Sequence, residues 1–197
     1  MSLIHSLKSR CGLVTLFLGA VSIIVYILMR LSNAESFVQA LYISSFYANV
    51  LGIEIRQGQI WRLVTPIFVH FDLLHLALNL MGAWFLGCVL ESLLRRQIYI
   101  MFVVVTAILS NLGQYWMTGP AFGGLSGVVY GMFGYLVVDA FFNPRSKIVI
   151  PLDFLWLFLV FYVVGFTGVF GNLANTAHTV GLLVGAAFAA LPIVLRR

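Results

Sequence analysis

A serine and a histidine in apolar surroundings are the residues of this chain best suited to chemistry. Ser126 lies between glycines in the segment AFGGLSGVVYG (121–131), and His178 lies in the segment AHTVGLLVG (177–185). A serine hydroxyl is a weak nucleophile, which an adjacent histidine can activate by accepting its proton. If the fold brings the two side chains together, the sequence predicts a Ser–His dyad for acyl transfer.

Two further polar residues could complete such a site. His75 and Asn79 are four residues apart, so on a helix they would project from one face. Acyl transfer needs donors aimed at the developing oxyanion, and these side chains could serve together with the backbone N–H of Ser126. Asp72 is the acid expected at a membrane depth similar to that of these residues, and nothing in the sequence directs its carboxylate at His178. The pattern therefore favours a dyad over a triad.

The composition predicts an integral membrane protein. The chain has 197 residues, of which 62% are hydrophobic and 9% charged, and its mean hydropathy is +1.06. Soluble domains carry about a quarter charged residues. The net charge of +5 comes from basic residues grouped at the ends of apolar runs, which is a topology signal and excludes a nucleic-acid patch.

The elements expected to position the site are transmembrane helices. We expect an all-α, six-helix bundle that forms a single domain over residues 1–197, with a long, aromatic-rich and partly membrane-embedded loop at 33–71. The predicted spans cover approximately residues 11–29, 72–91, 97–117, 126–142, 148–166 and 174–195.

Charges beside these spans predict their orientation. If six spans alternate, one side holds all of Lys8, Arg10, Arg95, Arg96, Arg145, Lys147, Arg196 and Arg197. The positive-inside rule then puts both termini in the cytoplasm. Spans two, four and six begin on the outer side, so His75, Ser126 and His178 are expected at a similar depth below the outer surface.

Small residues predict how the fourth and sixth spans meet. Each span carries a stripe of small residues at helical spacing, Gly127, Gly131 and Gly134 in one and Gly181, Gly185 and Ala189 in the other. Such stripes let membrane helices approach closely, which would place Ser126 beside His178. The cysteines at 11 and 88 are expected to be buried thiols that form neither a disulfide nor a metal site.

Alternative interpretations remain open at this point. His70, His75, His178 and Asp72 could ligate a metal ion, or the histidines could line a transport path. Each polar residue could also be structural: Ser126 as a helix cap or packing residue, and His75 with Asn79 as a polar clamp between helices. Asn111 and Gln114 are expected to be structural or to line water. The sequence holds no H-E-x-x-H motif, and its mid-span positions are nearly free of charge, which disfavours a metalloprotease and a transporter.

Four segments together resemble the rhomboid intramembrane serine proteases, of the bacterial GlpG type. They are WRLVTPIFVH (61–70), HFDLLHLALN (70–79), GLSG (124–127) and AHTVGLLVG (177–185). The resemblance implies that Ser126 is the nucleophile, that His178 is the general base, and that His75 and Asn79 line the oxyanion hole. It implies no metal and no cofactor.

The resemblance also implies supporting roles. Tyr130 would pack on the histidine of the dyad, Glu91 would hold the inner end of span two, and Trp61 and Arg62 would anchor the first loop. The further supporting residues are Gly124, Gly127, His70, Gly181 and Gly185. Ala121 departs from the family, in which many members carry a bulky aromatic, and only about ten residues precede the first span, where such members often carry a soluble domain.

The implied activity is hydrolysis of peptide bonds in or near transmembrane segments of membrane proteins. The implied location is the bacterial inner membrane, with the site open to the periplasmic side. An inactive rhomboid-like binder of membrane proteins is the remaining alternative. The sequence does not specify the substrate, its route to the site, or the oligomeric state.

Overall fold

A computed structural model describes residues 11–31, 34–44, 53–169 and 173–195, and they fold mainly into helices joined by loops. The α-helices are α2 (Leu13–Leu28), α3 (Glu35–Leu41), α4 (Ile53–Arg56), α5 (Leu73–Gly82), α6 (Cys88–Leu93), α7 (Arg96–Thr118), α8 (Ser126–Phe142), α9 (Leu152–Gly165) and α10 (Asn175–Val194). Two 3₁₀ turns, η1 (Ile60–Leu63) and η2 (Thr65–Phe68), precede α5, and a π turn, η3 (Ala83–Gly87), joins α5 to α6. The basic residues Lys8, Arg10, Arg196 and Arg197 lie outside the described residues.

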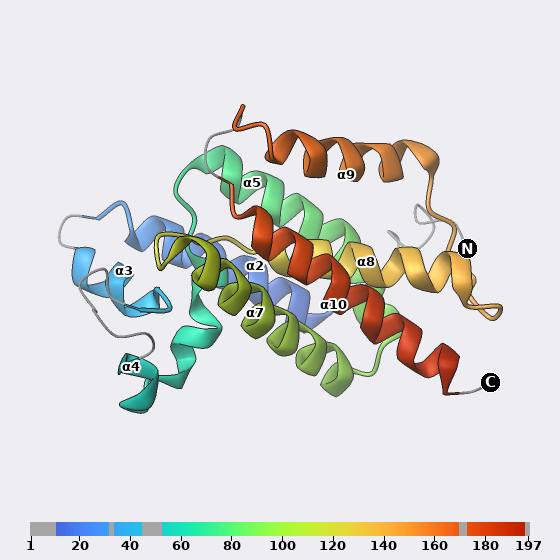
Figure 1. Cartoon of the computed structure of the whole chain (residues 1–197), viewed down its shortest axis with the longest axis horizontal. Coiled ribbons are helices and arrows are strands. Elements are labelled where there is room, and N and C mark those ends of the chain that lie inside the picture. Colours follow the sequence, from blue (N-terminus) through green and yellow to red (C-terminus); the bar gives the residue numbers. More distant parts are fainter. Residues whose placement is uncertain (1–10, 32–33, 45–52, 170–172, 196–197) are drawn as a thin grey trace.

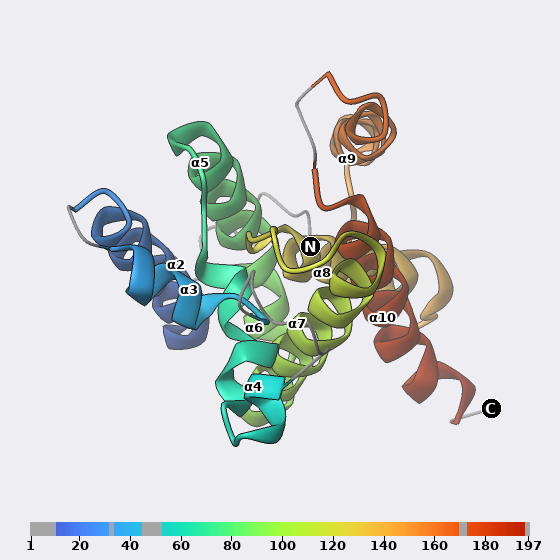
Figure 2. The same ribbon diagram turned by 60° about the vertical axis from the view of Figure 1, so that its left-hand side comes forward.

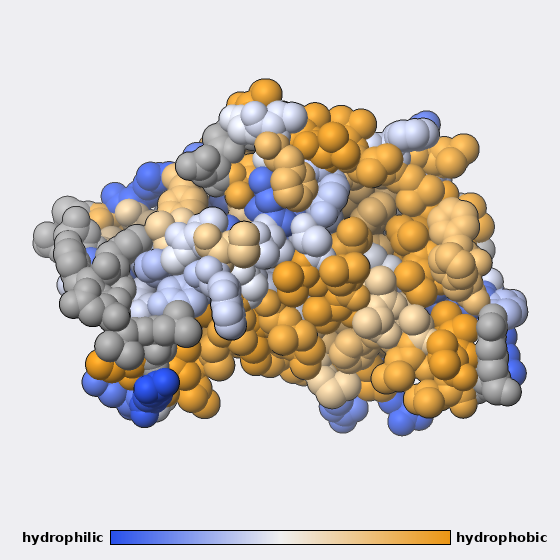
Figure 3. Space-filling model, viewed as in Figure 1, coloured by the Kyte–Doolittle hydropathy of each residue, from blue (hydrophilic) through white to orange (hydrophobic). Residues whose placement is uncertain are grey.

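Each predicted span overlaps a helix or a continuous run of helix. Three of these, over Leu73–Leu93, Arg96–Thr118 and Asn175–Val194, are long and apolar enough to cross a membrane. The other three apolar helices, α2, α8 and α9, are shorter. The regular structure of the described residues is thus helical, and their surface is the apolar one that a membrane protein presents to lipid. Figure 3 shows this surface over much of one face.

Helix α8 lies in the centre of the bundle, and α10 runs alongside it (Figures 1 and 2). The two backbones touch at glycines: a Cβ atom on Gly181 would collide with the carbonyl oxygen of Gly127, and one on Gly185 with that of Gly131. The two stripes of small residues therefore face each other, which is the arrangement that their spacing predicts.

Helix α9 stands apart from this core. Figures 1 and 2 show it along one edge of the molecule, next to α10, and its apolar side chains are largely exposed. One polar contact to α10 is the hydrogen bond of 2.8 Å between the hydroxyl groups of Tyr162 and Thr179. A second is the bond of 2.9 Å that Asn175 Nδ2 donates to the carbonyl oxygen of Gly165.

The expectation of free thiols is wrong, because Cys11 and Cys88 form a disulfide. The bond joins the start of α2 to the start of α6, across 77 residues of sequence. Glu91 strengthens the same junction, since its carboxylate accepts hydrogen bonds from the backbone N–H groups of Val14 and Thr15 at 2.9 Å each. The sequence gives no sign of the pairing, which depends on how α2 packs against the second predicted span.

Trp61 and Arg62 join two described parts of the long loop, η1 and the segment that contains α3. Trp61 Nε1 donates to the carbonyl oxygen of Ala40 at 3.3 Å. The buried guanidinium of Arg62 donates to the carbonyl oxygens of Gln39 and Tyr42 at 2.6 and 2.8 Å. Residues 45–52, which include the aromatic residues of the loop at 46 and 47, lie outside the described residues.

Candidate active site

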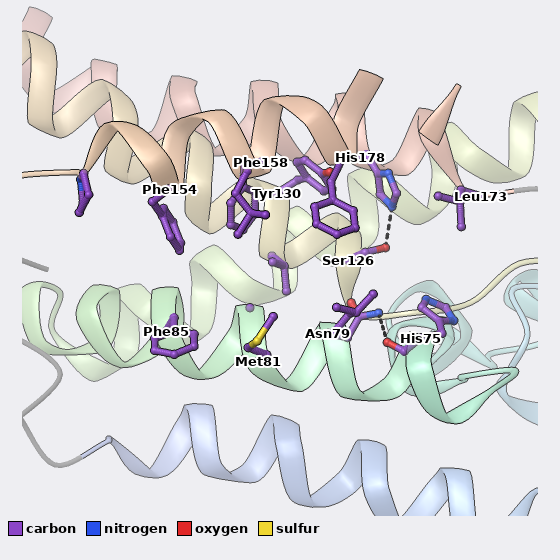
Figure 4. A pocket seen from close by; sticks show the side chains of 16 residues that line it. His75, Asn79, Met81, Phe85, Ser126, Tyr130, Phe154, Phe158, Leu173 and His178 are labelled. Carbon is purple, nitrogen blue, oxygen red and sulfur yellow. Dashed lines mark hydrogen bonds between the residues drawn. The ribbon is translucent and has the colours of Figure 1, made fainter. Parts of the chain in front are cut away.

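The structure brings Ser126 and His178 together. His178 Nε2 lies 2.8 Å from Ser126 Oγ, within hydrogen-bonding distance (Figure 4). The ring of Tyr130, one turn along α8 from Ser126, stacks on the imidazole with the centroids 4.6 Å apart and an interplanar angle of 28°. A hydroxyl and an imidazole therefore meet, and an aromatic ring packs against the imidazole.

Ser126 is the first residue of α8, so its backbone N–H has no acceptor within the helix. The segment that leads into the helix is held by the loop before α5. Gly124 N–H donates to the carbonyl oxygen of Pro66 at 3.0 Å, and Leu125 N–H lies 3.4 Å from Nε2 of His70. Gly124 has a φ of +123°, a backbone conformation that a residue with a side chain rarely adopts.

His70 has a structural environment. Its side chain is fully buried, and its Nδ1 lies 3.1 Å from the carbonyl oxygen of Phe68. Burial, reinforced by the neighbouring ring of His75, lowers the pKa of His70 to about 4, although Phe68 and the carboxylate of Asp72 oppose this shift. A neutral ring that donates from Nδ1 can accept from Leu125 through Nε2.

His75 and Asn79 face the same cavity from α5, as Figure 4 shows. A Cβ atom on Gly124 would lie 2.6 Å from Nε2 of His75, which places this ring beside the segment that precedes Ser126. Asn79 Nδ2 donates to the carbonyl oxygen of His75 at 2.9 Å, and Oδ1 of Asn79 is buried and has no hydrogen-bond partner among the described residues. An amide nitrogen carries two protons, so Nδ2 retains a second one to donate.

Asp72 caps helix α5 and does not contact His178 in the described structure. Its Oδ1 accepts the backbone N–H of His75 at 2.7 Å, so the carboxylate caps the start of α5. Within the described part of the chain, no three side chains of His, Cys, Asp or Glu are grouped as a metal ion would require. The four residues considered for a metal site in the sequence are thus not assembled into one.

Gln114 has a structural role, as the sequence suggested, through a partner that the sequence did not identify. Its Oε1 accepts the backbone N–H of Ala177 at 3.0 Å in a buried position. Ala177 precedes His178 in the first turn of α10, so this bond from α7 fixes the start of the helix that carries the histidine. A polar residue in an apolar helix was the available signal, but it did not identify the partner.

The pair lies in a groove of about 430 Å³ between α5 and α9 (Figure 4). Besides the polar residues named above, its walls are apolar and include Leu78, Met81, Phe85, Phe154, Phe158 and Leu173. The groove therefore offers a polar end at Ser126 and an apolar channel that continues along α5 and α9.

Comparison with known proteins relates this chain to a single family. A family model described as the Rhomboid domain matches residues 57–194. The chain is 36% identical to the Rhomboid protease GlpG of Pectobacterium atrosepticum and to that of Salmonella typhi, over 185 residues in each case. It is 34% identical over 188 residues to the Rhomboid protease GlpG of Yersinia pestis. Each match covers 93% of this chain and 64% of the relative's length.

Proposed function

Because the chain belongs to the rhomboid family, we propose that it is an intramembrane serine protease with Ser126 as nucleophile and His178 as general base. The observation that carries this proposal is the distance of 2.8 Å between Ser126 Oγ and His178 Nε2. The proposed reaction is hydrolysis of a peptide bond in or near a transmembrane segment of another membrane protein.

The proposed chemistry proceeds in two steps. Ser126 Oγ attacks the carbonyl carbon of the substrate while His178 Nε2 accepts the hydroxyl proton, and this proton then passes to the leaving amine. A water molecule next attacks the acyl-enzyme, again with His178 as the base, and releases the acid and the serine. Both steps require the tautomer of His178 that carries its proton on Nδ1. The stacked ring of Tyr130 supports the orientation of His178 where a triad would use a carboxylate.

The proposed oxyanion hole combines three donors. They are the backbone N–H of Ser126 at the start of α8, the ring of His75 and the second amide proton of Asn79. The helix N-terminus adds a partial positive charge at the same point. Each such donor contributes only when negative charge develops on the oxygen, so it accelerates the reaction without tightening substrate binding equally.

The apolar lining of the groove supports the proposal that an apolar substrate reaches Ser126 from the bilayer. Its walls between α5 and α9 suit the side chains of an unwound transmembrane segment, because a helical substrate would hide the carbonyl group. We propose that the substrate enters between these two helices. Helix α9 lies at the edge of the bundle. Its movement would separate the stacked rings of Phe158 on α9 and Phe133 on α8, whose centroids are 4.3 Å apart.

We propose a single domain of six spans over residues 1–197, with both termini in the cytoplasm and the site open to the periplasmic side. The length of α8 supports a site below the outer surface. Its 17 residues extend for about 25 Å, whereas the hydrocarbon core is about 30 Å thick. If α8 reaches the inner surface, Ser126 lies within the membrane.

Cleavage of a transmembrane reporter by the protein in vesicles tests the proposal. We expect Ser126→Ala and His178→Ala each to abolish cleavage, and Ser126→Ala to abolish labelling by a serine-reactive fluorophosphonate. The matched control is Ser22→Ala, because Ser22 is also a buried serine but bonds only to the carbonyl oxygen of Leu18 on α2.

Cleavage that persists in either dyad variant would refute the assignment. A native protein that folds yet neither cleaves nor takes up the fluorophosphonate would instead favour an inactive rhomboid-like binder. Loss of activity caused by chelators alone would favour the metal alternative.

A further inference from the structure

A second cavity, of about 670 Å³, lies at the end of α8 opposite to Ser126. It is bounded by the end of α6, the first turns of α7, the last turns of α8 and the last turns of α10. Most of its wall is apolar, including Leu93, Ile98, Met101, Phe188, Leu191 and Ile193. Several of these side chains, such as Met101 and Leu191, are exposed, so the cavity opens toward the lipid.

Arg145 provides the positive charge in the lining of this cavity. The turn that presents it is fixed, since Arg145 N–H donates to Asn143 Oδ1 at 3.1 Å and Ser146 Oγ donates to Asp139 Oδ2 at 2.6 Å. The guanidinium is exposed, and none of the residues described by the structure accepts a hydrogen bond from it. The arginine is thus held in place with its charged group free.

Asp139 is an acid in the same wall and would oppose an anion. Both of its oxygens are engaged, because Oδ1 accepts from Asn143 Nδ2 at 2.7 Å and Oδ2 accepts from Ser146 Oγ. Two further exposed arginines, Arg95 and Arg96, lie in sequence between the lining residues Leu94 and Ile98. Basic charge therefore exceeds acidic charge around the cavity.

An apolar cavity with an arginine in its wall, and two more arginines nearby in sequence, matches the chemistry of an anionic phospholipid. Guanidinium groups bind phosphate through paired hydrogen bonds, and the acyl chains would lie against the apolar wall. Basic pockets between transmembrane helices are suited to anionic headgroups. We propose that this cavity, between the ends of α8 and α10 and the start of α7, binds an anionic phospholipid through Arg145.

The test uses the protein in phosphatidylcholine vesicles that contain a small fraction of phosphatidylglycerol with a photoactivatable acyl chain. We expect cross-links on the peptides that contain Met101 and Leu191, and labelling several-fold weaker with a phosphatidylcholine probe that carries the same chain. Arg145→Gln should reduce phosphatidylglycerol labelling to the phosphatidylcholine level, whereas Arg145→Lys should retain most of it.

Arg56→Gln is the matched control. Arg56 is an exposed arginine on α4, at the end of the molecule away from the C-terminus in Figure 1, so its replacement should leave labelling unchanged. Equal labelling by the two lipids would overturn the proposal, as would labelling of the cavity that is unaffected by Arg145→Gln. Because Arg145 is exposed, the helical content of each variant, measured by circular dichroism, should match that of the native protein.

Discussion

Gly124 is the backbone position on which the geometry at Ser126 most depends. Its φ is +123°, and a Cβ atom there would lie 2.6 Å from Nε2 of His75. A side chain would therefore strain the backbone and displace the His75 ring from the proposed oxyanion hole.

We predict that Gly124→Ala lowers reporter cleavage by about a hundredfold, the scale of losing one oxyanion donor. Gly119→Ala is the matched control, because Gly119 also has a positive φ, of +78°, but no atom of the described residues lies within 4 Å of its Cβ position. Both variants should insert and remain helical by circular dichroism. If Gly119→Ala reduced cleavage as much as Gly124→Ala, backbone strain rather than the collision with His75 would be responsible.

His70 makes the free energy of unfolding depend on pH. Its pKa is lowered from 6.5 to about 4, so between these values the unfolded chain binds a proton that the folded chain does not. The free energy of unfolding should therefore fall as the pH decreases from about 6.5 to about 4. Protonation would also remove the acceptor for Leu125 N–H.

This effect is measurable as the thermal midpoint in detergent over the same pH range. His70→Gln should show a smaller decrease than the native protein, because glutamine does not titrate, while His75 and His178 are present in both proteins. An equal decrease in both would assign the pH dependence to other groups.

Residue types alone identified Ser126 and His178 as candidates, because a hydroxyl and an imidazole in apolar helices are conspicuous. The partners that hold them were not predictable. The contact between His70 and Leu125 joins positions 55 residues apart, and that between Gln114 and Ala177 joins positions 63 residues apart. Such contacts depend on loop conformation and helix rotation, which hydrophobic periodicity does not determine.

Helix packing was predictable where small residues form a stripe, as in α8 and α10. We predict that Gly185→Ala forces these helices apart, because its Cβ would collide with the carbonyl oxygen of Gly131. The expected loss of stability is on the order of 1–3 kcal/mol. Cleavage should also fall, since His178 lies on α10 and Ser126 on α8.

The control for this variant is Gly19→Ala on α2, where the Cβ would meet only Leu80 Cδ2 at an ordinary 3.5 Å. Its stability should be unchanged or higher by up to about 1 kcal/mol, because alanine favours a helix more than glycine does. Thermal unfolding in detergent and reporter cleavage distinguish the two variants. A Gly185→Ala protein as stable and active as the native one would mean that α8 and α10 tolerate separation.

The positions of the apolar helices were also predictable, whereas their lengths were less so. The predicted fifth span, 148–166, begins four residues before α9, because Ile148 and Ile150 are apolar yet lie in the loop after α8. The disulfide was not predictable either, because two isolated cysteines form no spacing pattern that would indicate a pair.

At the scale of the whole molecule, the disulfide between Cys11 and Cys88 closes a loop between two positions 77 residues apart in sequence. Loop-closure entropy suggests a stabilisation on the order of 4 kcal/mol for a loop of this length. We predict that a reductant lowers the thermal midpoint of the purified protein, and that the Cys11→Ser, Cys88→Ser double variant has the lower midpoint with or without reductant. No response of the native protein to reductant would contradict the prediction. In the proposed orientation this bond lies on the cytoplasmic side, where thiols are usually kept reduced.

The apolar groove between α5 and α9 also has a pharmacological consequence. A compound that combines an electrophile for Ser126 with an apolar tail for this groove would dissolve in the bilayer before it met the protein. Its apparent potency would then depend on the mole fraction of compound in the lipid, not on its concentration in water. Doubling the lipid at a constant total dose would weaken inhibition, so doses measured in different vesicle or detergent preparations could be compared only after correction for partitioning.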